Sequence, residues 1–281
     1  MGRCEPRRAG AGSPAFTLNW AERIVSATGL AVTGGRKLAG GDLGGAALVE
    51  LADGRKLVAK GGPLVEREAD MLRAIAASGV PAPEVHHAAD GLLLMDHVEA
   101  DGAKGWDSLA EALHRLHAPR AATYGWDVDY AFGPLAIPNT PQDNWPEFWA
   151  RHRLLCHGEK VDGSITARLE KLAKRLSELL PVSPPPALLH GDLWGGNVLF
   201  HQGKLAALID PASYVGHREG DVAMLTLFDN PPDSFFDALD LEAGWRERLP
   251  IYRLWPLLVH LRLFGHSYRG SVVSALDALG A

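Results

Sequence analysis

The stretch Leu188-Leu-His-Gly-Asp-Leu-Trp-Gly-Gly-Asn-Val-Leu-Phe200 and the stretch Leu205-Ala-Ala-Leu-Ile-Asp-Pro-Ala212 place polar residues beside short apolar runs. Asp192 and Asn197 are five residues apart, and Asp210 ends the next β-rich run. An acid, an amide and a second acid in this order are what a catalytic loop and a metal loop need for phosphoryl transfer. The two stretches therefore predict a phosphoryl-transfer site on loops between strands.

Composition limits the class of protein. A chain of 281 residues with 47% hydrophobic content can bury a full core in one large or two modest domains. The net charge of −6, without any run of Lys or Arg, argues against a nucleic-acid partner. Cys4 and Cys156 form neither a CxxC pair nor a disulfide framework, which favours a reducing cytoplasm. The sequence leaves open whether Cys156 has a redox role.

The N-terminal residues 1–16 are positively charged but lack the apolar stretch of a signal sequence, so we expect a flexible tail there. Nowhere do eighteen apolar residues follow one another. These two observations predict a soluble protein without a membrane partner.

Apolar periodicity predicts an α+β fold with two lobes. Residues 17–98 are expected to form a small lobe with an antiparallel sheet and a helix packed on it, and residues 99–281 a larger, mainly helical lobe. In the small lobe we expect helices at residues 17–28 and 64–78, two strands within 34–51, and strands at 55–60, 84–89 and 91–98. In the large lobe we expect helices at residues 106–117, 144–157, 162–180 and from 217 onward, and strands at 187–190, 198–201 and 204–209.

The three polar residues of the two loops divide the chemistry between them. Asp192 is positioned to orient the acceptor hydroxyl and take its proton. Asn197 and Asp210 offer hard oxygen ligands to Mg²⁺, which neutralises charge on the phosphates of ATP.

Further candidates lie in the small lobe. Lys60 ends the strand with Val58-Ala59-Lys60 and is expected to reach the phosphates of ATP, while Glu68 on the next helix pairs with it. Gly40, Gly41 and Asp42 belong to a glycine-rich turn whose backbone N–H groups can approach phosphate. Each signal alone is weak, because a strand-end lysine or a helix glutamate is usually a solvated surface residue. Their order along the chain matches that of a kinase, which favours ATP chemistry.

The segment after Asp210 distinguishes kinds of kinase. Only ten residues separate Asp210 from Asp221, and no A-P-E sequence follows, so the platform on which protein kinases bind peptides is missing. Asp210-Pro-Ala212 also stands where protein kinases have D-F-G. We therefore expect a small-molecule kinase without a phosphorylation switch.

At this level of detail the chain resembles one family. His190-Gly-Asp-Leu-Trp-Gly-Gly-Asn197 is similar to the HGDLW-x-GN signature of fructosamine kinases (ketosamine-3-kinases), which are related to aminoglycoside phosphotransferases. Asp210-Pro-Ala-Ser-Tyr-Val-Gly-His-Arg-Glu-Gly-Asp-Val-Ala-Met224 is similar to that family's DPA-x-Y-x-GHRE-x-D-x-AM block. The resemblance extends from about Asn19 to the C-terminus and implies a bilobal protein kinase-like fold.

The resemblance also implies an activity and partners. It implies ATP- and Mg²⁺-dependent phosphorylation of a sugar hydroxyl, namely the 3-hydroxyl of a free or protein-linked ketosamine, by a monomer that acts in deglycation. By matching position, Asp192 is the base, Asn197 and Asp210 bind Mg²⁺, and Lys60 with Glu68 holds ATP. The remaining matched positions are the adenine-binding hinge (Met95, Asp96, His97, Val98), an acid that braces the catalytic loop (Asp221), and residues that contact substrate or support the structure (Trp194, His217, Arg218).

Two alternatives remain open at this stage. The chain departs from the family pattern after Asn144 and at Gly220, both on the acceptor side, so an aminoglycoside-type or other metabolite phosphotransferase is the second reading. A nucleotide-binding pseudokinase regulator is the third. The presence of four catalytic-type residues argues against it, namely Lys60, Asp192, Asn197 and Asp210.

Overall fold

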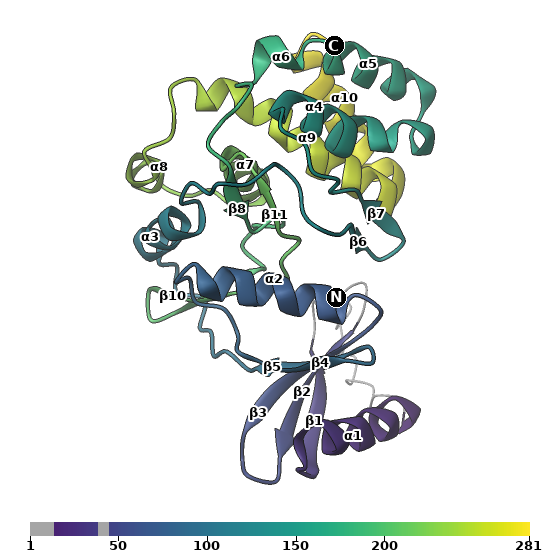
Figure 1. Ribbon diagram of the computed structural model, residues 1–281, viewed down its shortest axis with the longest axis vertical. Coiled ribbons are helices and arrows are strands. Elements are labelled where there is room, and N and C mark those ends of the chain that lie inside the picture. The colour runs from purple at the N-terminus through teal and green to yellow at the C-terminus, as the bar shows by residue number, and fades with distance from the viewer. Residues whose placement is uncertain (1–13, 39–44) are drawn as a thin grey trace, which may run out of the picture. The chain divides into compact units, whose positions relative to one another are not determined.

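The computed structural model describes residues 14–38 and 45–281 (Figure 1). The expected glycine turn with Gly40, Gly41 and Asp42 lies outside the described residues, as does most of the expected tail. Two compact units make up the chain. The first unit comprises Met1–Glu66 and Val85–His97, and the second comprises Arg67–Glu84 and Val98–Ala281.

An antiparallel sheet of five strands forms the centre of the first unit. Its middle strands carry the apolar runs Leu57-Val-Ala59 and Leu92-Leu-Leu-Met95, which are buried because strands pair with them on both sides. The turn into β3 contains Gly54 at φ +86°, a backbone conformation that glycine adopts without strain. In sheet order the strands are β1 (Val32–Leu38), β2 (Ala46–Leu51), β3 (Lys56–Gly61), β5 (Leu92–Asp96) and β4 (Val85–Ala89).

Helix α1 (Pro14–Thr28) contributes to the core of the first unit. Ile24 is completely buried and belongs to the same apolar cluster as Leu57 and Leu94 of the sheet. A Cβ atom at Gly61 would lie 2.7 Å from the indole ring of Trp20, so the indole can pack there only because residue 61 has no side chain. The helix is therefore fixed against the sheet by close packing.

Helix α2 (Val65–Ala77) follows the apolar spacing that the sequence predicts. Ala69, Leu72 and Ile75 are fully buried, and the chain leaves the helix through Gly79, which has a φ of +78°. Glu68 lies on this helix and is only 9% exposed. It is therefore not one of the solvated charges that usually line a helix face.

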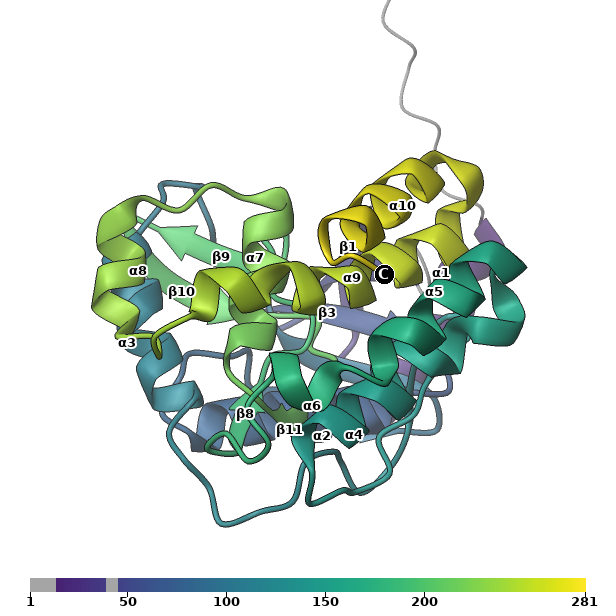
Figure 2. The same cartoon turned by 90° about the horizontal axis from the view of Figure 1, so that it is seen from above.

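Helices on either side of the catalytic segment form much of the core of the second unit. The 20-residue α9 is buried mainly between Leu249 and Val259 although it contains Pro250 and Pro256, and it packs against both α7 and α10 (Figure 2). The helices are α3 (Trp106–Leu116), α7 (Glu219–Phe228), α8 (Asp233–Leu239), α9 (Trp245–Phe264) and α10 (Arg269–Ala278), and the 3₁₀-helix η3 (Gly265–Tyr268) joins the last two.

The segment between residues 144 and 180 corrects the sequence prediction of two continuous α-helices. The first predicted helix is divided into three segments: α4 (Trp145–Trp149), the π-helix η1 (Ala150–Leu154) and the 3₁₀-helix η2 (Leu155–Lys160). The second is broken into α5 (Gly163–Ala173) and α6 (Leu176–Leu179). Apolar spacing cannot distinguish these helix types, and the wider π turn carries Arg153 into the interior.

Arg153 is fully buried within a cage of aromatic rings. Its guanidinium carbon lies 4.8, 4.1 and 5.0 Å from the ring centres of Phe148, Tyr214 and Trp255. It also donates hydrogen bonds to the Pro138 carbonyl and to Oδ1 of Asn139, both at 2.8 Å. Trp145, Phe148 and Trp149 lie in the core of this region and are at most 1% exposed.

Three short strand pairs lie among the helices of the second unit. Strand β8 leads into the loop with Asp192, and β10 leads into Asp210. The sequence did not predict β6, β7 or β11. The pairs are β6 (Tyr130–Phe132) with β7 (Leu135–Ile137), β8 (Ala187–Leu189) with β11 (Tyr214–Gly216), and β9 (Val198–His201) with β10 (Lys204–Leu208).

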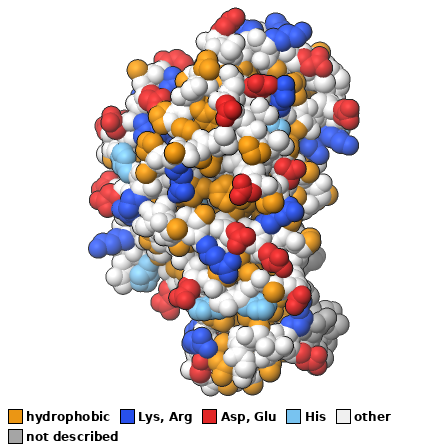
Figure 3. All heavy atoms as spheres, viewed as in Figure 1, with side chains coloured by type: hydrophobic (Ala, Val, Ile, Leu, Met, Phe, Trp, Pro, Cys, Tyr) orange, Lys and Arg blue, Asp and Glu red, His pale blue; other side chains and the backbone are white. Residues whose placement is uncertain are grey.

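The surface carries charges of both signs. On the face shown in Figure 3, acidic and basic side chains are interspersed with apolar ones rather than gathered by sign. Among the described residues, none of the helices combines the length and the apolar content needed to cross a bilayer.

Candidate active site

A buried carboxylate holds the loop between β8 and β9. The backbone N–H groups of His190 and Gly191 donate to Oδ2 and Oδ1 of Asp221, at 2.8 and 2.9 Å. Asp221 lies in the first turn of α7, where a negative charge is favourable because of the helix dipole. The loop backbone is therefore anchored immediately before Asp192.

The same carboxylate is bonded to His117, whose Nε2 lies 2.9 Å from Oδ2 of Asp221. Burial alone would raise the pKa of Asp221, but the hydrogen bond and charge of His117, with the hydrogen bond from the Gly191 N–H, outweigh it and lower the pKa. The sequence analysis missed this partner because His117 and Asp221 are 104 residues apart. A buried acid with three donors is a stable anchor.

His190 connects the two loops that carry the predicted chemistry. Its Nδ1 accepts the N–H of Asp192 at 3.3 Å, and its Nε2 lies 2.9 Å from the carbonyl of Ile209, to which it donates. Its own carbonyl accepts the N–H of Ala212 at 3.0 Å. Burial lowers the pKa of His190, which favours the neutral ring that this bonding pattern requires. His190 thus contacts the chain on both sides of Asp210.

Gly191 is the position where the two loops come closest. Its φ is +81°, and a Cβ atom there would lie 2.0 Å from the Ala212 carbonyl oxygen. Glycine alone satisfies both the left-handed backbone and the contact distance.

Asp192 and Asn197 form a hydrogen-bonded pair. Nδ2 of Asn197 donates to the Asp192 carbonyl at 2.8 Å and to Oδ2 of Asp192 at 3.0 Å. Burial raises the pKa of Asp192 to about 7, with the charges of Asp210 and Asp221 adding to the rise and the bond from Asn197 opposing it. A carboxylate with a pKa near neutrality is suited to accept a proton.

The donor set of the second unit fits a magnesium ion. Because the amide nitrogen of Asn197 is directed to Asp192, its oxygen Oδ1 is the atom left for a cation. Asp210 adds a carboxylate and has a φ of +53°, uncommon for a residue other than glycine. The N–H of Ile209 donates to the Asn197 carbonyl at 3.0 Å, which ties the two candidate ligands together through the backbone. Hard oxygen atoms are the ligands that Mg²⁺ prefers.

Tyr130 is a site residue that the sequence analysis missed. Burial raises the pKa of its phenol, and the charges of Glu68, Asp210 and Asp192 raise it further. The phenol therefore responds to the charges of three carboxylates of the candidate site. No sequence signal marks it, since it belongs to the short β6–β7 hairpin, which was not predicted.

The first unit contains the predicted phosphate-binding lysine and most of the hinge. Lys60 lies on β3, paired with Leu93 of β5, and is half-buried. Met95 and Asp96 end β5, and the N–H of His97 donates to the Lys56 carbonyl at 3.3 Å. Val98 is the first hinge residue of the second unit.

The three residues that sequence assigned to substrate contact or support differ in exposure. Trp194 is 41% exposed on the catalytic loop. His217 is fully buried, and its Nδ1 lies 2.8 Å from the Tyr252 hydroxyl. Arg218 donates to the carbonyls of Leu239 and Asp240 after α8. Trp194 is therefore available to a substrate, whereas His217 and Arg218 support the structure.

His217, Glu219 and Glu242 bring potential metal-ligating atoms within 4.8 Å of one another. Glu219, however, accepts two hydrogen bonds from Arg248, at 2.8 and 2.5 Å. The guanidinium already neutralises this carboxylate, so the cluster is better described as a buried ion-pair network than as a metal centre.

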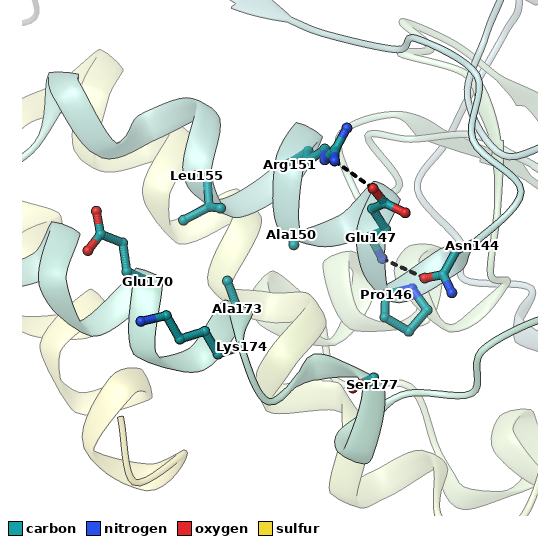
Figure 4. Close-up of a pocket in the computed structure, with 10 residues that line it drawn as sticks. All are labelled: Asn144, Pro146, Glu147, Ala150, Arg151, Leu155, Glu170, Ala173, Lys174 and Ser177. Atoms are coloured by element: carbon teal, nitrogen blue, oxygen red, sulfur yellow. Dashed lines mark hydrogen bonds and ion pairs between the residues drawn. The ribbon is translucent and has the colours of Figure 1, made fainter.

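A cavity of about 460 Å³ lies among α4, η1, η2, α5 and α6 (Figure 4). Glu147 and Arg151 form an ion pair of 2.7 Å on one side of it, and Glu170 and Lys174 lie on the other. None of the predicted site residues that the structure describes lines this cavity. The predicted site residues that the structure describes therefore lie away from this cavity.

Comparison with known proteins identifies the family. The sequence pattern of fructosamine kinases matches residues 24–280. This chain belongs to the fructosamine kinase family. A protein from Enterococcus faecium described as a probable ketoamine kinase is 36% identical over 227 residues, which are 75% of this chain and 81% of that protein.

Solved structures support the same family and fold. A protein from Thermobifida fusca YX-ER1 assigned as a fructosamine-3-kinase superposes with a TM-score of 0.84 at 35% identity, over 93% of this chain and 98% of that one. An aminoglycoside phosphotransferase in complex with AMP-PNP and hygromycin B has a TM-score of 0.64 at 17% identity, over 92% of this chain and 98% of that one, which shows a shared fold. The predicted kinase-like α+β fold is confirmed. The family makes this chain an ATP-using phosphotransferase that acts on an alcohol group.

Proposed function

We propose that this fructosamine kinase transfers the γ-phosphoryl group of ATP to the 3-hydroxyl of a ketosamine and so begins deglycation of an amine in the cytoplasm. The observation that carries the proposal is the geometry of the catalytic loop. Asp221 fixes the backbone before Asp192, and Asn197 fixes the side chain of Asp192. A base held from both sides is what in-line transfer to a hydroxyl needs.

In this mechanism Asp192 orients the acceptor hydroxyl and takes its proton as the oxygen bonds to phosphorus. Asn197 Oδ1 and the Asp210 carboxylate would hold Mg²⁺, which supplies charge neutralisation on the phosphates. The bond from Asn197 to Oδ2 of Asp192 leaves Oδ1 for the hydroxyl. Tyr130 adds a hydroxyl group near these acids.

We propose a division of labour between the expected lobes. Residues 17–98 would bind ATP through Lys60, Glu68 and the glycine-rich turn at the phosphates and through the hinge at Met95–Val98 on adenine. Residues 99–281 would bind the acceptor. The supporting observations are the central position of Lys60 in the sheet and the burial of Glu68.

Replacement of the base tests the mechanism. We expect Asp192→Asn to lower kcat by about 10² to 10⁴-fold, the usual contribution of general base catalysis. Asp107→Asn, at an exposed position in the first turn of α3, is the matched control and should retain the wild-type rate. A full rate in Asp192→Asn would remove the assigned base.

A substrate panel tests the acceptor. ATP consumption should be measured with ribulose- and fructose-derived amines beside aminoglycosides, at equal concentrations. Turnover of ketosamines and not of aminoglycosides supports the proposal. Turnover of aminoglycosides alone would show that the acceptor is an aminoglycoside and not a ketosamine, while the assigned phosphoryl-transfer chemistry would stand.

A further inference from the structure

A run of aromatic rings leads away from the catalytic loop. Seven large hydrophobic side chains are exposed in the described part of the chain, and three of them belong to this run: Trp194, Phe228 and Phe264, at 41, 44 and 51%. Such clustering is unlike the scattered exposed apolar residues of ordinary surfaces, and it marks an interaction site. We call Trp194, Phe228, His260, Phe264 and Tyr268 the aromatic run.

Each ring of the aromatic run contacts the next. The ring centres of Trp194 and Phe228 are 6.2 Å apart, those of Phe228 and His260 are 5.2 Å apart, and those of His260 and Phe264 are 5.4 Å apart. Tyr268 closes the far end, at 4.9 Å from His260 and 6.1 Å from Phe264. The surface is therefore continuous from the catalytic loop to η3.

Packed elements hold the rings in place. Phe228 ends α7, while His260 and Phe264 lie one turn apart on α9, which packs against α7 (Figure 2). Nδ1 of His260 lies 2.6 Å from the Pro256 carbonyl. Burial lowers the pKa of His260, against the raising effect of that hydrogen bond, so its ring is neutral near pH 7. The run thus offers an apolar rather than a cationic surface.

The end of the run at the catalytic loop is also fixed. The N–H of Gly195 donates to Asp229 at 2.6 Å, and Lys104 pairs with the same carboxylate at 3.3 Å. A Cβ atom at Gly196 would lie 2.3 Å from the Trp194 ring, so the indole folds closely over that glycine. Trp194 is therefore presented in a defined position, two residues after the base Asp192.

We propose that the aromatic run binds the apolar side chains of a peptide that flank a glycated lysine, and so selects ketosamines carried by peptides. This inference rests on the proposed function. Because the Cα atoms of residues two apart are at most about 7 Å apart, a sugar whose hydroxyl meets Asp192 is within reach of the exposed Trp194. The peptide attached to the sugar's amine then extends out of the site at Trp194, the first residue of the aromatic run.

The length of the run argues for a peptide rather than a free amino acid. Its three ring-to-ring steps of 5.2 to 6.2 Å correspond to roughly four or five residues of extended chain. A single amino acid on the sugar would cover only the first ring or two. The charged groups beside the run, Lys104 and Asp229, already neutralise each other, so the surface favours apolar neighbours of the lysine.

The test compares three acceptors with the full-length enzyme: a peptide with a central ribulosyl-lysine between leucine and phenylalanine residues, the same peptide with serines instead, and free ribulosyl-lysine. We expect the lowest KM for the apolar peptide. Phe264→Ser should raise the KM for the apolar peptide by about tenfold, because the phenylalanine no longer buries apolar area. The KM values for the apolar peptide and for free ribulosyl-lysine should then differ less than in the wild type.

Val182→Ser is the matched control, because Val182 is 49% exposed and lies outside the run. It should behave as the wild type with all three acceptors. Equal KM values for the three acceptors in the wild type, or equal effects of Phe264→Ser and Val182→Ser, would overturn the inference and leave the proposed function standing. A sedimentation change in Phe264→Ser alone would assign the run to a second copy of the chain instead. No turnover of any ketosamine would remove both proposals.

Discussion

Two regions of the second unit bury a charge in opposite ways. At the catalytic loop, the carboxylate of Asp221 is bonded to two backbone N–H groups and to His117. In the core beside η1, the guanidinium of Arg153 is bonded to carbonyl oxygens and covered by three aromatic rings. Directional bonds define the position of a backbone closely, whereas stacked rings tolerate small displacements. The difference indicates that the first charge serves geometry and the second serves packing.

Removal of the first charge should have the largest effect. Asp221→Ala leaves the N–H groups of His190 and Gly191 unpaired, so we expect about 3–5 kcal/mol lower stability and a fall in kcat of about 10²-fold from misplacement of Asp192. Chemical denaturation and steady-state kinetics measure the two quantities. Asp221→Asn, which keeps one acceptor oxygen, should lie between the wild type and Asp221→Ala. A normal kcat in folded Asp221→Ala would contradict the assigned geometric role.

Removal of the second charge should affect stability and spare the reaction. Arg153→Met retains much of the volume but leaves the Pro138 carbonyl and Oδ1 of Asn139 without their donor, so we expect a loss of about 2–4 kcal/mol. The kcat should stay within about twofold of the wild type, since Arg153 contacts none of the catalytic residues described above. A fall in kcat as large as that of Asp221→Ala would erase the distinction between the two regions.

A histidine near the arginine region makes stability depend on pH. Burial, with the charges of Arg262 and Arg153, lowers the pKa of His157 to about 3. The unfolded chain binds this proton near pH 6.5, so stability falls as the pH decreases from 6.5 towards 3, by about 2 kcal/mol at pH 5. His157→Gln should remove this part of the pH dependence in denaturation curves. An unchanged slope would show that His157 is protonated at the same pH in both states.

The smallest expected effect belongs to the hairpin that connects the two regions. The charges of the proposed catalytic acids raise the pKa of Tyr130. On the same strand, the ring centre of Phe132 lies 6.5 Å from that of Trp255 in the aromatic cage of Arg153. We expect Tyr130→Phe to lower kcat/KM by about fivefold, the value of one hydrogen bond between its hydroxyl and the bound substrate. Tyr124→Phe, which loses a bond to the Pro184 carbonyl, is the control and should change stability rather than rate.

The sequence predicted those parts of the molecule that local patterns encode. The sheet of the first unit and helix α2 follow alternation and helical spacing, and Asp192 and Asn197 are close in sequence as well as in space. The residues that hold the catalytic loop in place were harder to predict from the sequence. Asp221 could be placed through its motif, but its partner His117 could not, because nothing local marks a bond across 104 residues.

Helix type was the other limit of prediction. Residues 145–160 have one apolar periodicity but form three kinds of helix, because the backbone responds to where Arg153 finds its partners. That response depends on tertiary contacts with residues 138 and 139, which no window along the sequence contains. Tyr130 was missed for the same reason, since its three acidic neighbours come from three distant segments.

The bonds of His190 have a consequence for how this enzyme can diversify. One residue joins the backbone of the base to the carbonyl before Asp210 and to the N–H of Ala212. The separation between the base and the candidate magnesium ligand is thus set inside the protein, independently of the residues that face the acceptor. Under the proposed function, Trp194 and the rings beyond it can therefore be replaced to admit other acceptors while the positions of Asp192 and Asp210 relative to each other are kept.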